Sequence, residues 1–120
     1  MPFKKILTEL VEAAPGVTGA ILSDWEGEAV ELACRSVDEY ALKLLAAHQG
    51  IILGRLREIN GRLFGSRCCD MVATSGAGRC IVGTVGADYA LLVTLDSDTL
   101  VGRTLRRFRA TRELLVKEIY

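Results

Sequence analysis

The 120-residue sequence has no net charge and a single histidine, and both facts narrow the classes of function that it can have. Lys plus Arg and Asp plus Glu both number 15, so overall charge favours neither nucleic acid nor a membrane surface as a partner. No segment approaches the roughly 18 uncharged apolar residues of a membrane span. The N-terminal lysines are not followed by the apolar segment of a signal peptide. We therefore expect a cytoplasmic protein.

Residues that carry catalytic chemistry are few and scattered. The single histidine, His48, has no nearby Cys, Asp or Ser pattern, which favours a core or interface residue over a catalytic one. The stretch "TSGAGRC", residues 74–80, lacks the Lys-Ser/Thr of a phosphate loop and leads into strand-like sequence, so it predicts a hairpin turn. Asp96 and Asp98 are interpreted as turn and helix-cap residues. We expect no enzyme activity and no cofactor.

The cysteines and the arginine-rich end also have structural interpretations. Cys34, Cys68, Cys69 and Cys80 fit no zinc or redox template, and neighbouring cysteines on a strand would point to opposite faces. Small buried hydrophobic residues in a reducing compartment are favoured over a redox or metal site. The five arginines within 103–112 would spread around a helix, which favours a solvated face over an anion-binding surface.

Hydrophobic periodicity predicts three helices and five strands. The helices are expected at 3–14, at 38–59 and from 96–99 to the C-terminus, and the strands at 17–23, 28–34, 66–75, 79–85 and 89–95. Asp38 can cap the long helix, and Asn60-Gly61 is expected to stop it. Short connections containing Gly predict antiparallel hairpins. The order α-β-β-α-β-β-β-α predicts one α/β (α+β) domain over residues 1–120, with helices packed on a five-stranded antiparallel sheet.

The long helix is apolar nearly all round and holds two glycines one turn apart. At about 100° per residue, the side expected to cover the sheet carries Ala41, Leu45, His48, Ile52, Leu56 and Ile59. The opposite side carries a strip of small residues, Ala46, Ala47, Gly50 and Gly54, together with Lys43 and Arg57. Gly costs about 1 kcal/mol relative to Ala inside a helix, so the strip indicates that another backbone comes close. The same helix of a second subunit is favoured; incidental glycines, or a helix of the same chain, are the alternatives.

The segment "APGVTGAILSDWEGEAVELA", residues 14–33, is similar to the Pro-Gly-Val-x-Gly-Ala, Asp-x-x-Gly segment of Roadblock/dynein light chain domains. The likeness in layout continues over nearly the whole chain, although Trp25 stands where a basic or small polar residue is commoner. Bacterial members include MglB-like regulators of Ras-like GTPases. The resemblance implies a profilin-like fold and a dimer in which the long helices, 38–59, pair antiparallel and the third strands, 67–74, join two sheets. It also implies that the paired helices are a GTPase platform and that hydrolysis is promoted without an arginine finger.

On these grounds we expect a non-catalytic homodimeric module that binds and regulates a small Ras-like GTPase. The dimer interface is expected to contain Leu42, Ala46, Ala47, Gly50, Leu53, Gly54, Cys69 and Met71. Lys43 and Arg57 are the expected GTPase contacts. A scaffold subunit remains an alternative. So does a small-ligand sensor with an apolar pocket.

Overall fold

The computed structural model describes residues 2–66, 69–76 and 78–120 of the chain. Its elements are α1 (Pro2–Ala13), β1 (Val17–Asp24), β2 (Ala29–Cys34), α2 (Glu39–Phe64), β3 (Asp70–Ser75), β4 (Gly78–Val85), β5 (Tyr89–Leu95) and α3 (Val101–Ile119). The predicted α+β class and the predicted order of helices and strands are both confirmed. Within the described ranges, no helix is long and apolar enough to cross a membrane.

The five strands form one sheet in the order β2-β1-β5-β4-β3, and every neighbouring pair is antiparallel. Alternation along the strands sends side chains to two apolar layers, as expected for a sheet covered on both faces. One row of paired residues, Ala20, Val93 and Ile81, is buried on the first face. The next row, Ile21, Leu92 and Val82, is buried on the second face. The edge strands of the sheet are β2 and β3.

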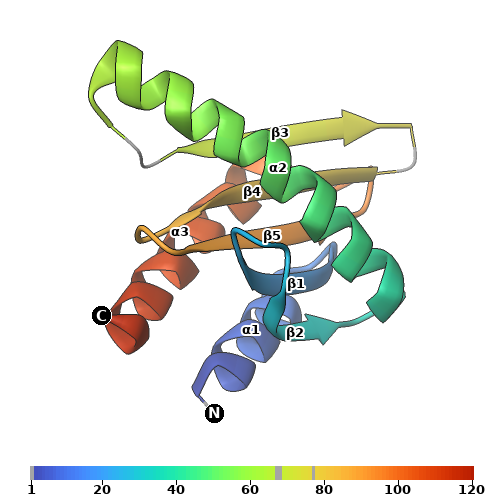
Figure 1. Ribbon diagram of the computed structural model, residues 1–120. Helices are drawn as coiled ribbons and strands as arrows, with labels where there is room; N and C mark the ends of the chain where they lie inside the picture. The colour runs from blue at the N-terminus through green and yellow to red at the C-terminus, as the bar shows by residue number, and fades with distance from the viewer. Residues whose placement is uncertain (1, 67–68, 77) are drawn as a thin grey trace.

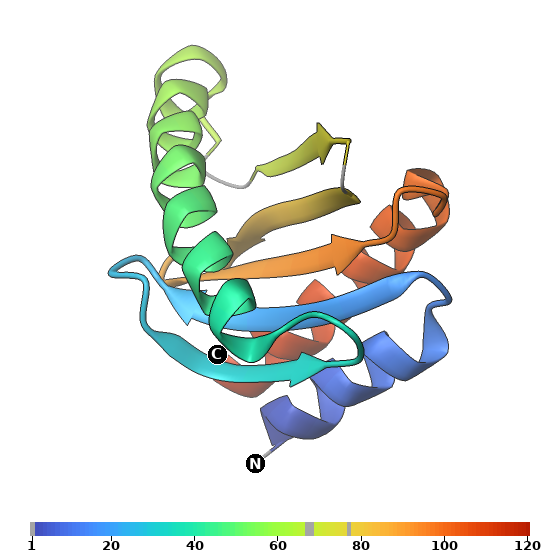
Figure 2. The same ribbon diagram turned by 90° about the vertical axis from the view of Figure 1, so that its right-hand side faces the viewer.

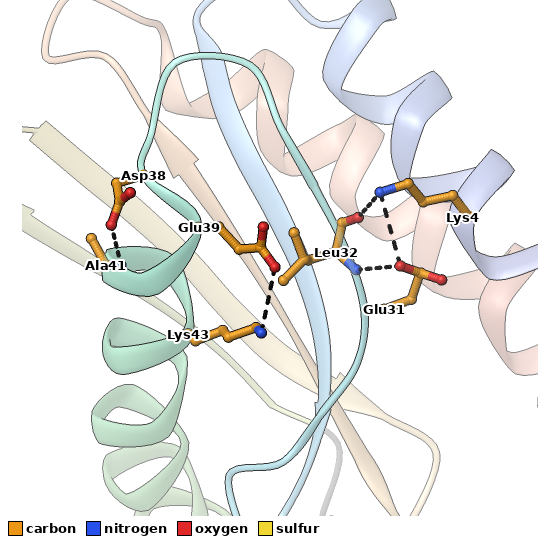
Figure 3. A network of polar contacts seen from close by, with 7 residues as sticks. All are labelled: Lys4, Glu31, Leu32, Asp38, Glu39, Ala41 and Lys43. Carbon is orange, nitrogen blue, oxygen red and sulfur yellow. Dashed lines mark hydrogen bonds and ion pairs between the residues drawn. The ribbon is translucent and has the colours of Figure 1, made fainter.

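The two faces of the sheet are covered unequally. Helices α1 and α3 lie together on the first face, where Leu7, Phe108 and Leu115 are fully buried, whereas α2 alone crosses the second face (Figures 1 and 2). Edge strand β2 is tied to α1 by Lys4, whose ammonium donates to the carbonyl of Leu32 at 2.6 Å (Figure 3). On the second face α2 has no neighbouring helix among the described residues, so its side chains that point away from the sheet remain exposed.

Three predicted boundaries are wrong. The long helix continues through Gly61 to Phe64 and ends at Gly65, which supplies the left-handed φ of 71° that favours glycine. The third strand begins at Asp70 and not at residue 66. The cap position of α3 is held by Leu100, which makes no side-chain cap bond, so the predicted aspartate cap is absent. The carbonyl of Asp96 accepts a turn hydrogen bond from Thr99 N at 3.2 Å, in line with its predicted place in a turn.

Candidate functional site

Helix α2 is the longest element, and its start is fixed by local polar contacts. The carboxylate of Asp38 accepts a hydrogen bond from the Ala41 backbone N–H at 3.0 Å, as predicted for a helix cap (Figure 3). One turn further on, Glu39 and Lys43 form an ion pair at 3.4 Å. Both of these charges are largely exposed, so the pair stabilises the helix only slightly.

The face of α2 that covers the sheet is formed by Leu42, Ala46 and Leu53, which are all buried. The prediction for this face is wrong: Ala41, His48, Ile52 and Ile59 are exposed, and only Leu45 and Leu56 are partly buried. The predicted face is rotated by roughly a quarter of a turn from the observed one. Apolar residues surround this helix almost completely, so hydrophobicity alone does not indicate which side faces the sheet.

The strip of small residues packs against a turn of the same chain. A methyl group on Gly54 would lie 3.9 Å from the Trp25 ring, and one on Gly27 would lie 3.4 Å from Ala47 Cβ. Trp25 is held in place because its indole N–H donates to the Ala87 carbonyl at 2.9 Å. The small residues therefore admit a close neighbour, as predicted. For Ala47 and Gly54 that neighbour is the β1–β2 turn, and Ala46 is buried in the core, so the predicted outward orientation is wrong for these three residues.

Gly50 has no such neighbour, which gives a direct test of this packing. A methyl group there meets no atom within 4 Å. The change Gly50→Ala is therefore expected to raise the free energy of unfolding by about 0.5–1 kcal/mol, the ordinary helix preference for alanine. Urea denaturation measures it. Gly65→Ala is the matched control and should destabilise, because φ there is 71°. A loss of stability in Gly50→Ala would contradict the prediction.

The part of α2 that points away from the sheet is exposed and carries large apolar side chains among charged ones such as Arg55 and Arg62. The large exposed apolar side chains of α2 are Tyr40, Leu44, Ile51, Ile52, Ile59, Leu63 and Phe64. Ile51 is 63% exposed, Ile52 49% and Ile59 51%, and they continue into Leu63 and Phe64 at 70% and 77%. This many exposed large apolar side chains on one helix are a signal of a binding partner.

The predicted interface residues do not form this exposed side. Leu42, Ala46 and Leu53 are buried within the chain, as is Cys69, so these four are not free to face a partner. Ala47, Gly50, Gly54 and Met71 are partly buried.

The two predicted GTPase contacts are set apart along α2. Lys43 is exposed near the start of the helix. Arg57 lies about 21 Å further along the axis. Its guanidinium stacks over the Trp25 ring, 4.9 Å from the centroid. The structure therefore does not bring them together. The stacking of Arg57 was not predicted, because it depends on how the β1–β2 turn folds back over the helix.

The described part of the chain contains no group of three or more His, Cys, Asp or Glu residues that could hold a metal ion. Cys69 and Cys80 are buried, as predicted, whereas Cys34 is exposed. Burial raises the pKa of the Cys80 thiol. At Cys34 the pKa is also raised, first by partial burial of the thiol and second by the negative charge of Glu39. Raised pKa values favour the thiol over the reactive thiolate. Cys68 lies outside the described residues, and His48 is exposed on α2.

Comparison with solved structures identifies the architecture. The chain superimposes on Myxococcus xanthus MglB with a TM-score of 0.84 at 17% identity, covering 99% of this chain and 95% of that one. A Roadblock/LC7 domain from Streptomyces avermitilis gives a TM-score of 0.81 at 17% identity, covering 97% of this chain and 96% of that one. The fold is that of the Roadblock/LC7 domain. Profilin IA of Acanthamoeba castellanii shares the Roadblock/LC7 layout more distantly, with a TM-score of 0.65 at 10% identity and coverage of 98% and 99%.

The sequence itself matches no protein-family model and no curated protein. The likeness therefore lies in the Roadblock/LC7 fold, and the site must be argued from the residues. In this chain the exposed apolar side chains belong to α2, which crosses one face of the sheet, and β3 is one of the two edge strands of that sheet (Figure 1). These two features together are the candidate site.

Proposed function

We propose that this chain is a cytoplasmic, non-catalytic, homodimeric module that binds and regulates a small Ras-like GTPase. The observation that carries the proposal is the set of exposed apolar side chains on α2, together with the position of β3 at the edge of the sheet. Exposed strand edges and apolar helix faces both tend to be covered by another chain. A second copy related by a two-fold axis would cover both at once, because such an interface joins the same surface of each subunit.

The groove between α2 and the sheet supports a dimer over the ligand-sensor alternative. It has a volume of about 530 Å³ and is bordered by Leu45 and Gln49 of α2 and by Ala73 to Ser75 of β3. A cavity of this size could hold a small molecule. Two of its borders belong to the elements of the proposed interface, and the rest of its lining comes from β1, β4, β5 and Val37. A partner subunit on α2 and β3 would therefore narrow the space open to a ligand.

The GTPase partner is proposed on two grounds: the structural similarity to MglB, and the resemblance of residues 14–33 to Roadblock/dynein light chain domains. A regulator needs only a different affinity for the two nucleotide states of its partner. The paired α2 helices would present Lys43 to that partner, since its side chain is 49% exposed and its only ion pair in the described ranges is with Glu39 of the same helix. Arg57 is less suited to act as an inserted arginine, because its guanidinium is already stacked on Trp25.

The test is single-turnover GTP hydrolysis by a Ras-like GTPase of the same organism, with and without this protein. We expect Arg55→Ala and Arg57→Ala to leave most of any stimulation intact. An inserted arginine would be worth about a thousandfold or more, so the loss of all stimulation in one variant, with binding retained, would contradict this mechanism. Binding to both nucleotide states is measured in parallel. If no such GTPase binds in either state, the proposal is wrong and the scaffold alternative is favoured.

A further inference from the structure

A second cavity lies at the end of β4, away from the exposed side of α2. Its volume is about 360 Å³. Helices from opposite faces of the sheet reach it: Arg57 comes from α2, while Arg112 and Glu113 come from α3. Thr84 of β4 lies between them in the lining. Two guanidinium groups therefore border one small cavity, although they belong to different layers of the fold.

Both guanidinium groups are fixed by aromatic rings. Arg57 stacks on Trp25 at 4.9 Å, and Arg112 lies over Phe108 at 5.2 Å. Stacking uses the flat face of a guanidinium and leaves its N–H edge free to donate. The Nε atoms of Arg57 and Arg112 are buried, and neither has a hydrogen-bond acceptor among the described residues. A buried charged donor without an acceptor is costly, so these edges favour an anionic group.

The charges around the cavity leave a small positive excess. Asp70 forms ion pairs with Arg112 and, at 3.4 Å, with Arg109. The lining itself holds Arg57, Arg112 and one acidic residue, Glu113, while Asp70 and Arg109 lie outside it. Thr84 adds a polar group, because its hydroxyl accepts from the Cys69 backbone N–H at 3.1 Å and can still donate its own proton.

We propose that this cavity binds a small phosphate-bearing molecule. Arg57 and Arg112 enter the lining from α2 and α3, on opposite faces of the sheet, so a group bound between them must accept from more than one direction. A tetrahedral phosphate offers acceptor oxygens in all of them, whereas a carboxylate offers two oxygens in one plane. The proposal is independent of GTPase binding, because it concerns a cavity separate from the exposed side of α2 and is tested on the isolated protein.

The experiment is an NMR titration of the isolated protein with inorganic phosphate at constant ionic strength, with acetate as a parallel probe. We expect saturable shifts at the Nε–H signals of Arg57 and Arg112 and at the Thr84 amide. Arg57→Gln is expected to weaken binding by about tenfold or more, the effect of losing one charge-assisted contact. Glu113→Gln is expected to tighten binding, because it removes a negative charge from the cavity lining.

Two exposed residues outside the cavity lining provide matched controls. Arg55→Gln and Glu118→Gln make the same changes of charge on α2 and α3 and should leave phosphate binding unchanged. If Arg57→Gln fails to fold, Glu113→Gln and Glu118→Gln test the proposal instead: only Glu113→Gln should tighten phosphate binding. The proposal is overturned if phosphate gives no saturable shift, if acetate binds as well as phosphate, or if the control variants change binding as much as the cavity variants.

Discussion

A chain with glutamate in place of both Ile52 and Ile59 is expected to be monomeric at concentrations where the unchanged chain is a dimer. These side chains are 49% and 51% exposed, so they contribute little to the chain's own core. In the proposed dimer they would be covered by the second copy of α2. Burying an unpaired carboxylate in an apolar interface costs several kcal/mol. A two-fold axis doubles that cost, because each substitution appears twice.

Sedimentation equilibrium measures the oligomeric state, and thermal denaturation checks that the variant remains folded. The matched control carries glutamate at Leu100 and Leu114, which are 69% and 48% exposed and lie at the start of α3 and within it. The control should keep the dimer, since the same charges are added away from α2. A variant that remains a dimer of equal stability would contradict the proposed interface, as would an unchanged chain that is monomeric.

The elements of the fold were predictable because they depend on local patterns. Alternating apolar residues mark the strands, short turns containing Gly mark the hairpins, and Asp38 marks the start of α2. The resemblance to Roadblock domains added the profilin-like layout, which the structural neighbours support. The end of α2 was not predictable in this way, because the helix passes through Gly61, a residue type that more often stops one.

The orientation of α2 could not be read from the sequence. Its apolar residues surround the axis, so at least two rotations bury a similar apolar area. The β1–β2 turn selects one of these rotations, because it places Trp25 against Gly54 and under the Arg57 guanidinium. That contact joins segments that are distant in sequence, and a one-dimensional pattern does not contain it. The departure of Trp25 from the family pattern was the available signal, and its meaning required the tertiary structure.

The contacts between Asp70 and the arginines of α3 were missed for the same reason, and they lead to the largest expected loss of stability. The change Asp70→Asn is expected to lower the free energy of unfolding by about 3 kcal/mol, the lower end for breaking a buried ion pair. The side chains of Arg112 and Asp70 are only 12% and 18% exposed, and Arg112 lies over the Phe108 ring. Asparagine keeps the shape of aspartate but leaves the Arg112 charge buried without a counter-charge. The melting temperature should fall by about 12 °C, at roughly 4 °C per kcal/mol.

Two comparisons separate the charge effect at Asp70 from a general loss of packing. Arg112→Met combined with Asp70→Asn should recover most of the stability, because no buried charge is then left unpaired. Glu39→Gln removes an ion pair to Lys43 whose side chains are 63% and 49% exposed, and it should change the free energy of unfolding by less than about 0.5 kcal/mol. Urea denaturation of all four chains gives the comparison. If Asp70→Asn costs no more than Glu39→Gln, the Arg112 charge is solvated in the folded protein and the buried pair is not what holds α3 to the start of β3.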